Sequence, residues 1–533
     1  MKQIIFFDIE RISEEDKINH IKWDLKAINN KYKLSGIGIE NFFESINQLK
    51  GDLRIYVWEL EYEGKYIEYY LFRNGYEYEP EQKLTNPKSF TILMNGDRNY
   101  YFIKIRREDN IITFLSLRHK YGNRHIEEIS KKYKINSNDK IKIMEQVIKY
   151  SWREKLYGLT AGSDSMSTYK KMIGKEVFLR DYPKISKSED KYLRDAYKGG
   201  IVYIKRTGEY HFVKVYDINS AYGSVLYNSE LPYGRGEYFE GKYKTDSVYK
   251  LYVQKIKVKC RLKKNMIPFI NLKKQRSNKD IQTDEKGNLI STRTQMTLIL
   301  TNYELEHFFK NYNVTECIYI DGMKWRSSNN KFRDYISHYY DLKQCGDYRG
   351  AIAKSMIVNL YGKFGTKSER EQIRLTYDKE KDLITTYAEE EECPLVYLPV
   401  AVFVTSALRD KMLTEMEKFA KNGQLLYADT DSIHISCGEY DIKNPSDKLG
   451  DFKLEAFCPR VKYFGRKKYC YEYFDKGGKW IPDNCKTKSV LAGFSLTDDS
   501  LKYSEFERGV VLDTKYFKAV RGGTIIAQQC AVI

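Results

Sequence analysis

Two aspartates, Asp429 and Asp431, are the residues of this chain whose types and spacing best suit chemistry. They lie in the run Tyr-Ala-Asp-Thr-Asp-Ser that ends at Ser432, between strand-like segments at 424–429 and 432–435. At the tip of a hairpin both carboxylates can approach one cation, and such hard oxygen ligands suit Mg²⁺. A surface turn rich in aspartate is the common alternative for an isolated Asp-x-Asp pair, but the full run is more specific.

A third carboxylate, Asp217, ends a strand-like segment at 212–218 and is followed by Ser220, Ala221 and Tyr222. Asp217 can therefore be a further metal ligand. Alternatively, Asp217 or Ser220 caps a helix that begins at Ala221. We expect both in part, because the start of such a helix directs free backbone N–H groups at an anion such as a triphosphate.

A lysine and a tyrosine, Lys354 and Tyr361, lie within 331–364, which we expect to form two helices broken at Gly346 and Gly350. Their spacing puts both side chains on one helical face, where they can contact a phosphate and a base or sugar. Alone, this segment would favour a solvated lysine and a core tyrosine.

The composition fits a large protein that binds a polyanion. The chain has 533 residues, a net charge of +18 and 47 tyrosines, many of them beside lysine or arginine. Cations neutralise phosphates and aromatic faces stack on bases, so the mixture suits a nucleic-acid groove. A genome of low GC content is the equally weighted alternative, since it enriches Lys, Ile, Asn and Tyr without any binding role.

The cysteines and the apolar runs exclude several other classes. Nine cysteines are spread from Cys260 to Cys530 without a C-x-x-C pair, which argues against a disulfide framework and a structural zinc site. The simplest compartment is a reducing cytoplasm. No apolar run has the length of a membrane span, and the short apolar stretch that ends at Asp8 does not resemble a secretory signal.

In this order, the three segments resemble the motifs of family B DNA polymerases of the protein-primed kind found in small bacteriophages and linear plasmids. That family carries D-x-x-S-L-Y, then K-x-x-x-N-S-x-Y-G and Y-x-D-T-D-S, followed by K-x-Y, which matches 467–469. A connector motif, Y-x-G-G, matches 197–200, and 159–165 resembles the segment before the polymerase region. The resemblance runs from about residue 159 to the C-terminus.

Two departures from the family pattern stand out. Val358 and Asn359 occupy the positions of the family's asparagine and serine, and Gly223 stands where proline is usual. We expect the first change to alter one contact of the second motif and the second change to be milder.

The resemblance implies a polymerase site with two Mg²⁺ ions, for which Mn²⁺ can substitute. Asp217 and Asp431 would hold the ions and Asp429 would be a third catalytic carboxylate; the ions would activate the primer 3′-hydroxyl and neutralise pyrophosphate. Tyr222 would exclude a 2′-hydroxyl and so select dNTPs. The other implied nucleotide contacts are Ser220, Ala221, Lys354, Tyr361, Lys343 and Arg349. The implied DNA contacts are Tyr197, Lys198, Gly199, Gly200, Asn359, Gly362, Lys467 and Tyr469.

The expected fold is a multidomain α+β architecture, a ribonuclease-H-like domain followed by a right-hand polymerase. The expected regions are an exonuclease-like domain (1–158), a connector (159–200), palm (201–330 and 366–480), fingers (331–365) and thumb (481–533). Two palm insertions are expected at about 261–322 and 366–398 because both are longer than a palm loop requires. In this subfamily one insertion binds the terminal protein that primes synthesis and the other closes a ring around the template.

The exonuclease pattern is degraded. Asp8 and Glu10 match the first carboxylate pair of the family's 3′–5′ exonuclease, whereas Glu63 and Asp139 are only positional substitutes for the later carboxylates. The position of the last one falls on Lys140, beside Asp139. Because two-metal hydrolysis depends on ligand placement at the 1 Å scale, we expect weak or absent proofreading.

The favoured reading is an active polymerase that uses primer–template DNA, dNTPs and a terminal protein, as a monomer in the cytoplasm of a host cell. The alternatives are a DNA-binding relic without strong catalysis, a nuclease, and an untemplated or RNA-directed polymerase. The intact carboxylates argue against the relic, the degraded N-terminal pattern against the nuclease, and the Y-x-D-T-D-S form against an RNA template.

Overall fold

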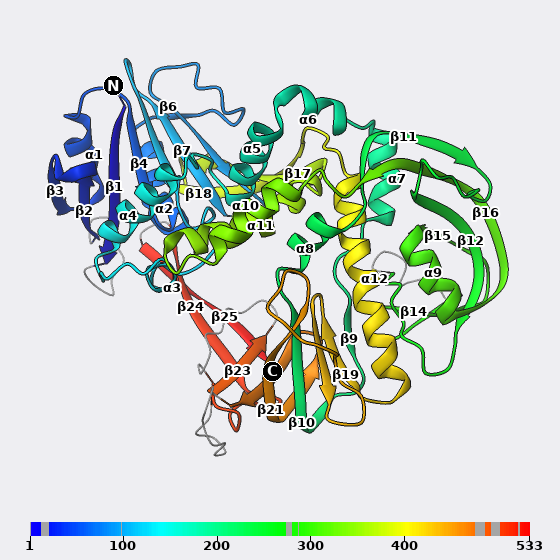
Figure 1. The fold of residues 1–533 in the computed structure, drawn as a ribbon. Helices are drawn as coiled ribbons and strands as arrows, with labels where there is room; N and C mark the ends of the chain where they lie inside the picture. Colours follow the sequence, from blue (N-terminus) through cyan, green and yellow to red (C-terminus); the bar gives the residue numbers. More distant parts are fainter. Residues whose placement is uncertain are drawn as a thin grey trace.

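The structure is a computed structural model that describes residues 2–11, 21–96, 99–272, 280–285, 287–474, 486–491, 501–520 and 523–532. In Figure 1 the N-terminal domain (blue) lies beside the rest of the chain, whose central helices α10 and α11 run between that domain and the long helix α12. A separate sheet with β11, β12 and β16 lies on the far side of α12. The expected multidomain α+β fold is confirmed.

The N-terminal domain is built on an eight-stranded sheet with the order β3-β2-β1-β4-β8-β7-β6-β5. β1 is antiparallel to β2 and parallel to β4, and β4 is parallel to β8. This is the expected ribonuclease-H-like arrangement, extended by three strands beyond β8. The strands are β1 (Gln3–Arg11), β2 (Ile21–Ala27), β3 (Lys33–Ile37), β4 (Leu53–Val57), β5 (Glu77–Tyr78), β6 (Ser89–Met94), β7 (Tyr100–Arg106) and β8 (Ile111–Ser116).

Helices cover both faces of this sheet, which explains the unbroken apolar run in β1. Phe6 packs on the face that carries α4, whereas Ile5 and Phe7 pack on the face that carries α1 and α2. The helices are α1 (Ile39–Asn47), α2 (Leu60–Arg73), α3 (Ile126–Lys132), α4 (Lys140–Arg153) and the short 3₁₀ turn η1 (Ile28–Asn30).

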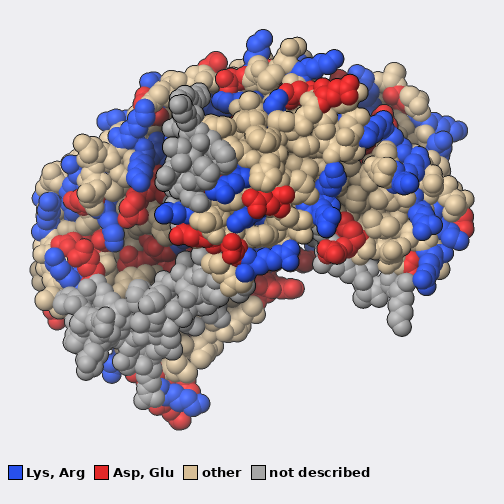
Figure 2. Space-filling view, turned by 90° about the horizontal axis from the view of Figure 1, so that it is seen from below, with Lys and Arg blue, Asp and Glu red and all other residues tan. Residues whose placement is uncertain are grey.

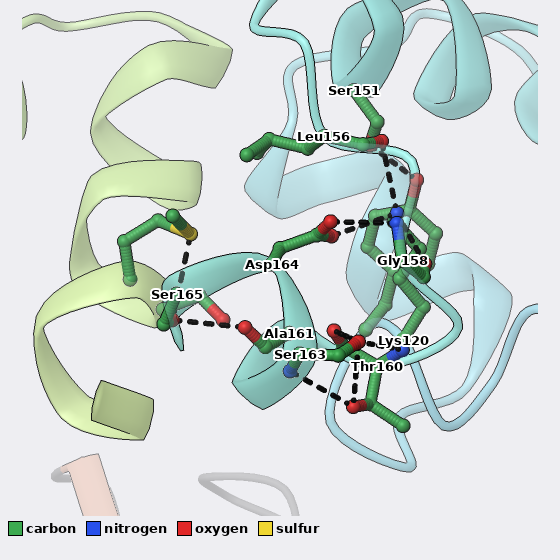
Figure 3. A network of polar contacts seen from close by, with 12 residues as sticks. Lys120, Ser151, Leu156, Gly158, Thr160, Ala161, Ser163, Asp164 and Ser165 are labelled. Carbon is green, nitrogen blue, oxygen red and sulfur yellow. Dashed lines mark hydrogen bonds and ion pairs between the residues drawn. The ribbon is translucent and has the colours of Figure 1, made fainter. Parts of the chain in front are cut away.

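A buried ion pair joins the N-terminal domain to the connector (Figure 3). The connector helices are α5 (Ala161–Ile173), α6 (Lys175–Asp181) and α7 (Lys187–Ala196). Lys120 Nζ donates to Asp164 Oδ2 at 2.8 Å and to the carbonyl oxygen of Gly158 at 2.8 Å, while the Gly158 N–H donates to Asp164 Oδ1 at 2.6 Å. Ser165, the next residue of α5, donates to Met356 Sδ at 3.5 Å. The joint therefore connects three parts of the chain that are far apart in sequence.

The region expected to be the palm contains a seven-stranded sheet with the order β23-β22-β21-β10-β20-β19-β9. The three strands predicted around the aspartates are confirmed as β10, β19 and β20. β23, from the stretch assigned to the thumb, pairs with β22 and so extends this sheet. The elements are β9 (Val202–Ile204), β10 (Gly208–Ile218), α8 (Ala221–Asn228), α12 (Pro399–Lys421), β19 (Leu425–Asp429), β20 (Ser432–Ser436), β21 (Phe452–Gly465), β22 (Lys468–Tyr473) and β23 (Lys486–Leu491).

The two helices predicted for 331–364 are confirmed as α10 (Arg333–Lys343) and α11 (Tyr348–Phe364). Gly346 lies in the break between them, as expected. The prediction of a second break at Gly350 is wrong, because this residue lies inside α11. A Cβ at Gly350 would lie 2.5 Å from the Cys345 carbonyl oxygen, so glycine lets the preceding loop fold back on the helix.

The expected first insertion belongs to a six-stranded sheet with the order β11-β16-β12-β14-β13, on which β15 pairs with β12. The expected boundaries, 261 and 322, both lie inside strands, since β12 and β16 pair along their length. The elements are β11 (Leu231–Glu240), β12 (Leu251–Leu262), β13 (Ile281–Thr283), β14 (Leu289–Thr292), β15 (Met296–Thr301), α9 (Asn302–Asn311) and β16 (Tyr312–Ser328).

The expected second insertion is a hairpin, β17 (Glu369–Asp378) and β18 (Leu383–Glu392), that packs against the N-terminal domain. Tyr377 stacks on Phe72 with ring centroids 4.9 Å apart, and Tyr69 donates to Asp382 at 2.6 Å. Ile373 joins the apolar core of the N-terminal domain. The hairpin therefore closes a contact between segments roughly 300 residues apart in the chain.

The C-terminal stretch forms the antiparallel hairpin β24 (Val511–Val520) and β25 (Gly523–Val532). The two strands expected around Gly522-Gly523 are thus present, while Gly522 itself lies outside the described residues. On the face shown in Figure 2, basic side chains are spread over the whole surface and interspersed with acidic ones. None of the described helices is long and apolar enough to span a bilayer.

The buried ion pair of the joint predicts a large asymmetry between single and double substitutions. Asp164→Ala should lower the free energy of unfolding by about 3–5 kcal/mol, because it leaves the Lys120 ammonium buried without a counter-charge. Lys120→Met combined with Asp164→Leu should cost much less. Urea unfolding measures both, and Arg124→Ala, which removes an exposed pair with Glu128, is the control. Equal losses in the single and double variants would contradict the assignment.

Candidate active site

Two strands of the palm bring Asp217 and Asp431 together. Asp217 at the end of β10 is paired with Ser432 at the start of β20, and the Ile218 N–H donates to the Asp431 carbonyl oxygen at 2.9 Å. Thr430 has a φ of 59°, which makes the β19–β20 turn tight enough for the Asp431 N–H to reach the Asp429 carbonyl at 2.7 Å. The sequence-predicted carboxylates thus meet at one end of the sheet.

Burial and neighbouring negative charges act on the two carboxylates. Burial and then the charges of Asp431 and Glu455 raise the pKa of Asp217 to about 7. Burial and then the charge of Asp429 raise the pKa of Asp431 to about 6. Each anion is therefore destabilised where it lies, and a cation between them would remove the cause.

Asp429 has a different environment from the other two aspartates. Its Oδ1 accepts from Lys467 Nζ at 2.9 Å and from the Thr430 hydroxyl at 3.0 Å. Lys467 belongs to the K-x-Y motif, and its N–H also donates to the Tyr427 hydroxyl at 2.9 Å. Asp429 thus fixes the turn and pairs with a lysine, which leaves Asp217 and Asp431 as the carboxylates that face the cavity without such a partner.

Lysines from the fingers form the opposite wall of the site, a cavity of about 550 Å³. Lys343 Nζ donates to Ser220 Oγ at 2.7 Å and to Asn219 Oδ1 at 2.9 Å. Burial and the charges of Lys354 and Lys453 lower the pKa of Lys343. A cavity with carboxylates on one wall and crowded ammonium groups on the other suits a metal-bound triphosphate.

The helix expected after Asp217 is present, but neither Asp217 nor Ser220 caps it with its side chain. Ser220 precedes α8 with a φ of 53°, and its hydroxyl accepts from Lys343 instead. The capping prediction is therefore wrong because the lysine takes the hydroxyl. The helix start at Ala221 still faces the cavity, where its first N–H groups can meet an anion.

Tyr222 and Tyr361 stack on each other at the base of the fingers, with ring centroids 4.0 Å apart and 22° between the ring planes. Gly223, which stands where the family has proline, lets α8 and α11 approach closely. A Cβ at Gly223 would lie 2.4 Å from the side chain of Ile357 in α11. Val358 lines the cavity, whereas the Asn359 amide donates to the Ser355 carbonyl at 2.8 Å along its own helix.

The connector motif packs against the β19–β20 turn that carries Asp429 and Asp431. The Thr430 N–H donates to the Ile201 carbonyl at 2.8 Å, and a Cβ at Gly200 would lie 2.6–2.8 Å from the Thr430 side chain. The Gly199 carbonyl accepts from Arg409 Nη1 at 3.0 Å. Glycine at 200 is therefore needed for the close approach of the connector to the turn.

Lys198 points into the protein. Its ammonium pairs with Glu304 at 3.0 Å, which also binds Arg409 at 3.2 Å. The pair lies where the connector, α9 and α12 meet. A DNA contact by Lys198 stays a prediction that would require this network to open.

The remaining predicted contacts fall into two groups. Tyr469 is buried in an aromatic cluster with Tyr427 and His434 beneath the catalytic turn, and it lines the cavity. The other three residues, Tyr197, Gly362 and Arg349, do not line the cavity. Tyr197 lies beside Gly365, and a Cβ at Gly362 would have no neighbour within 4 Å. Arg349 pairs with Asp347 at the start of α11.

Sequence reasoning missed several residues of this site. Lys453 lies directly across from Asp217 in the β10–β21 ladder, and Glu455 and Lys488 form an ion pair at 2.8 Å in the same cavity. Alternation along β21 predicts a common face for Lys453 and Glu455. Only the sheet register places that face beside Asp217, so no local signal could have identified it.

The N-terminal carboxylates form a second, smaller group. Glu63 on α2 faces Asp8 on β1, since the charge of Asp8 contributes to raising the Glu63 pKa. Lys140 Nζ lies 3.5 Å from Asp8 Oδ1. Glu10 also lies near Asp8, while Asp139 caps α4 by accepting from the Lys142 N–H at 3.1 Å and does not join the group.

Comparisons with known proteins agree with this architecture. The sequence model of the family described as DNA polymerase type B, organellar and viral, matches residues 119–447. The DNA polymerase of Bacillus phage B103 is 28% identical over 524 residues, covering 88% of each chain. That of Bacillus phage phi29 is also 28% identical and covers 95% of this chain and 94% of its own.

A solved structure of phi29 DNA polymerase with primer-template DNA has the same fold, with a TM-score of 0.87 over 100% of both chains at 23% identity. The expected family B resemblance to phage polymerases is therefore confirmed. Since the family model covers more than half of the sequence, this chain belongs to the type B DNA polymerases, organellar and viral.

Proposed function

We propose that this polymerase adds dNTPs to a primer 3′-hydroxyl in the cavity between Asp217, Asp431 and the lysines of the fingers, with two Mg²⁺ ions. The observation that carries the proposal is the pair of partly buried carboxylates, Asp217 and Asp431, whose pKa values rise to about 7 and about 6. Carboxylates whose charged forms are disfavoured by burial and by nearby negative charges are stabilised by a divalent cation, for which they are suitable ligands.

The residues present fit Mg²⁺. Within the part of the chain that the structure describes, no three His, Cys, Asp or Glu side chains form a ready-made metal cage. Mg²⁺ sites in nucleotide-binding enzymes commonly use one or two carboxylates and complete their shell with phosphates and water. Bound there, the ions would supply Lewis-acid activation of the primer hydroxyl and charge neutralisation of the leaving pyrophosphate. Mn²⁺ is expected to substitute.

The protein's own groups position the triphosphate. Lys354 and Lys343 face the carboxylates from the fingers and would neutralise phosphate oxygens, and the N-terminus of α8 would add backbone donors. The Ser220 hydroxyl holds Lys343 at 2.7 Å, so the ammonium is oriented before the nucleotide enters. Support also comes from phi29 DNA polymerase, which has been solved with primer-template DNA and incoming nucleotide substrates.

Substitution of one metal-binding carboxylate tests the proposal. Asp431→Asn keeps the size of the side chain but removes the charge, so templated dNTP extension should fall by about 10³-fold or more while binding of primer–template DNA persists. Primer extension and fluorescence anisotropy measure the two properties. Activity within a few-fold of the wild type would overturn the proposed role. Loss of DNA binding in parallel would show that the substitution disrupts the fold.

Tyr222 is proposed to select deoxyribonucleotides. Its ring lines the cavity and is held flat against Tyr361, which suits a platform beneath the sugar. Tyr222→Val should raise the relative incorporation of rNTPs by about 10²-fold, since a steric gate of this size is removed. Single-nucleotide insertion kinetics with dCTP and CTP measure the ratio. Tyr361→Val, which removes the stacking partner, is the matched control and should change the ratio much less.

The close approach of Gly200 to Thr430 gives a further prediction with an internal control. Gly200→Ala should displace the catalytic turn and lower kcat by about 10²-fold, because a shift near 1 Å in reacting groups has that effect. Gly199→Ala should leave kcat nearly unchanged, since a Cβ at residue 199 has no neighbour within 4 Å. Single-turnover incorporation compares them. Equal effects at the two positions would contradict the proposed support of the turn.

We also propose protein-primed replication with strand displacement. The β17–β18 hairpin packs on the N-terminal domain through Tyr377, Phe72 and Asp382, an arrangement that supports a closed path for the template. The sheet that contains 261–322 is the proposed surface for a terminal protein. The monomeric state and the host cytoplasm remain predictions.

The N-terminal domain is proposed to have little or no 3′–5′ exonuclease activity. Lys140 stands where the family's last exonuclease carboxylate is expected, and its ammonium lies 3.5 Å from Asp8. Burial raises the pKa of Glu63 well above its usual range. The lysine beside Asp8 and the burial that disfavours the charged form of Glu63 both oppose the binding of two divalent cations.

Degradation of a 5′-labelled single strand measures this directly. The wild-type chain should release no more 3′ nucleotides than its Asp8→Ala variant, in Mg²⁺ or Mn²⁺. Exonuclease activity that disappears on Asp8→Ala would show that the group is functional.

A further inference from the structure

A second cavity, of about 280 Å³, lies in the N-terminal domain between its sheet, the C-terminal end of α4 and residues 157–159. Four of its lining residues are Lys2, Arg54, Lys104 and Lys120, and no aspartate or glutamate lines it. It shares Lys120 and Gly158 with the joint of Figure 3. Since Lys120 is paired with Asp164, three basic side chains remain for a ligand.

The sheet register places two of these cations in one row. Arg54 of β4 and Lys104 of β7 both pair with Thr113 of β8, so they flank it on neighbouring strands. Two strand spacings put their Cα atoms about 10 Å apart, a distance that two long side chains can bridge through one phosphate. Thr113 offers a hydroxyl between them.

The next row on the same face is apolar and aromatic. Tyr56, Leu115 and Phe102 are cross-strand neighbours in the same three strands, two residues further along, and all line the cavity. Lys104 Nζ lies 4.5 Å from the centre of the Phe102 ring. The cavity therefore has a cationic end and an aromatic end.

The cations have no counter-charge at hand. Within the described ranges no ion pair involves Lys2, Arg54 or Lys104, and the buried Nε of Arg54 has no hydrogen-bond partner there. A buried donor without an acceptor is costly. A bound anion would supply the acceptor and the counter-charge.

Aromatic side chains continue to the rim. Trp152 lines the cavity, and Tyr157 and Leu159 at its edge are 65% and 39% exposed. Cations for a phosphate beside rings for stacking are the features of a single-stranded nucleic-acid site. The volume suits one nucleotide and excludes a duplex.

We propose that this cavity binds one nucleotide of single-stranded DNA, with its phosphate between Arg54 and Lys104 and its base against Trp152 and Tyr157. The exposed rim at Tyr157 and Leu159 lets the strand continue out of the cavity, which favours a polymer over a free nucleotide. Arg54 pairs with Ile4 of β1, four residues and about 13 Å along the strand from Asp8, so the phosphate site is separate from the N-terminal carboxylates.

Photocrosslinking tests the site in the full-length protein. An oligonucleotide of thymidines with one 5-iododeoxyuridine is irradiated with the polymerase in the presence of excess unlabelled primer–template, and crosslinked peptides are mapped by mass spectrometry. Crosslinks should fall on residues 152–159 and drop at least about 10-fold in Arg54→Gln/Lys104→Gln. The variant Lys33→Gln/Lys83→Gln removes the same charge from exposed positions elsewhere in the domain and should crosslink like the wild type.

Salt dependence and a rim variant complete the test. In the Arg54→Gln/Lys104→Gln variant the slope of log K against log salt for single-stranded DNA should be smaller by about 0.7, the contribution of the one phosphate that the two side chains hold. Tyr157→Ala, at an exposed position, should lower the crosslink yield without changing the melting temperature. Absence of crosslinks at 152–159, or equal yields in the two double variants, would overturn the site. Equally efficient crosslinking by free 5-iodo-dUMP would overturn the assignment to a DNA strand.

Discussion

The close approach of two partly buried carboxylates is the constraint around which the polymerase region is arranged. Asp217 and Asp431 are distant in the sequence and close in the sheet. The register of β10 and β20 pairs Asp217 with Ser432, the residue after Asp431, and so holds the two carboxylates near each other. Burial and nearby negative charges raise the pKa values of both carboxylates. The proposed binding of divalent cations rests on this property, because a cation would stabilise both charged forms.

Several neighbouring groups offset the negative charge of these carboxylates or fix their positions. Asp429 adds a third negative charge beside Asp431, and Lys467, which pairs with Asp429, offsets part of it. The lysines of α10 and α11 face the carboxylates across the cavity, where they lie ready for phosphates. Behind the turn, the connector glycine at 200 packs on Thr430, and Arg409 ties the connector to α9 and α12. The turn is thus fixed by an ion pair on the cavity side and by close packing on the other side.

The N-terminal domain differs, because there a lysine of the protein itself, Lys140, lies 3.5 Å from the carboxylate of Asp8.

Sequence reasoning identified the elements whose signal is local. The strands that carry Asp217, Asp429 and Asp431 were predicted because alternation and turn chemistry are encoded within a few residues. The two helices of the fingers followed from their apolar spacing, although Gly350 proved to be a packing glycine inside α11. What could not be predicted depends on register: Lys453 reaches the site only because β21 pairs with β10. The hydroxyl of Ser220 was expected to cap a helix, and no local feature reveals that Lys343, more than a hundred residues later, takes it.

The most direct test of the two-metal claim is to count the ions. Electron paramagnetic resonance of Mn²⁺, titrated into the polymerase with a primer that lacks its 3′-hydroxyl, a template and the matching dNTP, reports the number of bound ions. The account predicts about two per chain, falling in both the Asp217→Asn and Asp431→Asn variants while the nucleotide's own Mn²⁺ affinity is subtracted in a protein-free control. Binding that equals the protein-free control, or that is unchanged in both variants, would contradict the account.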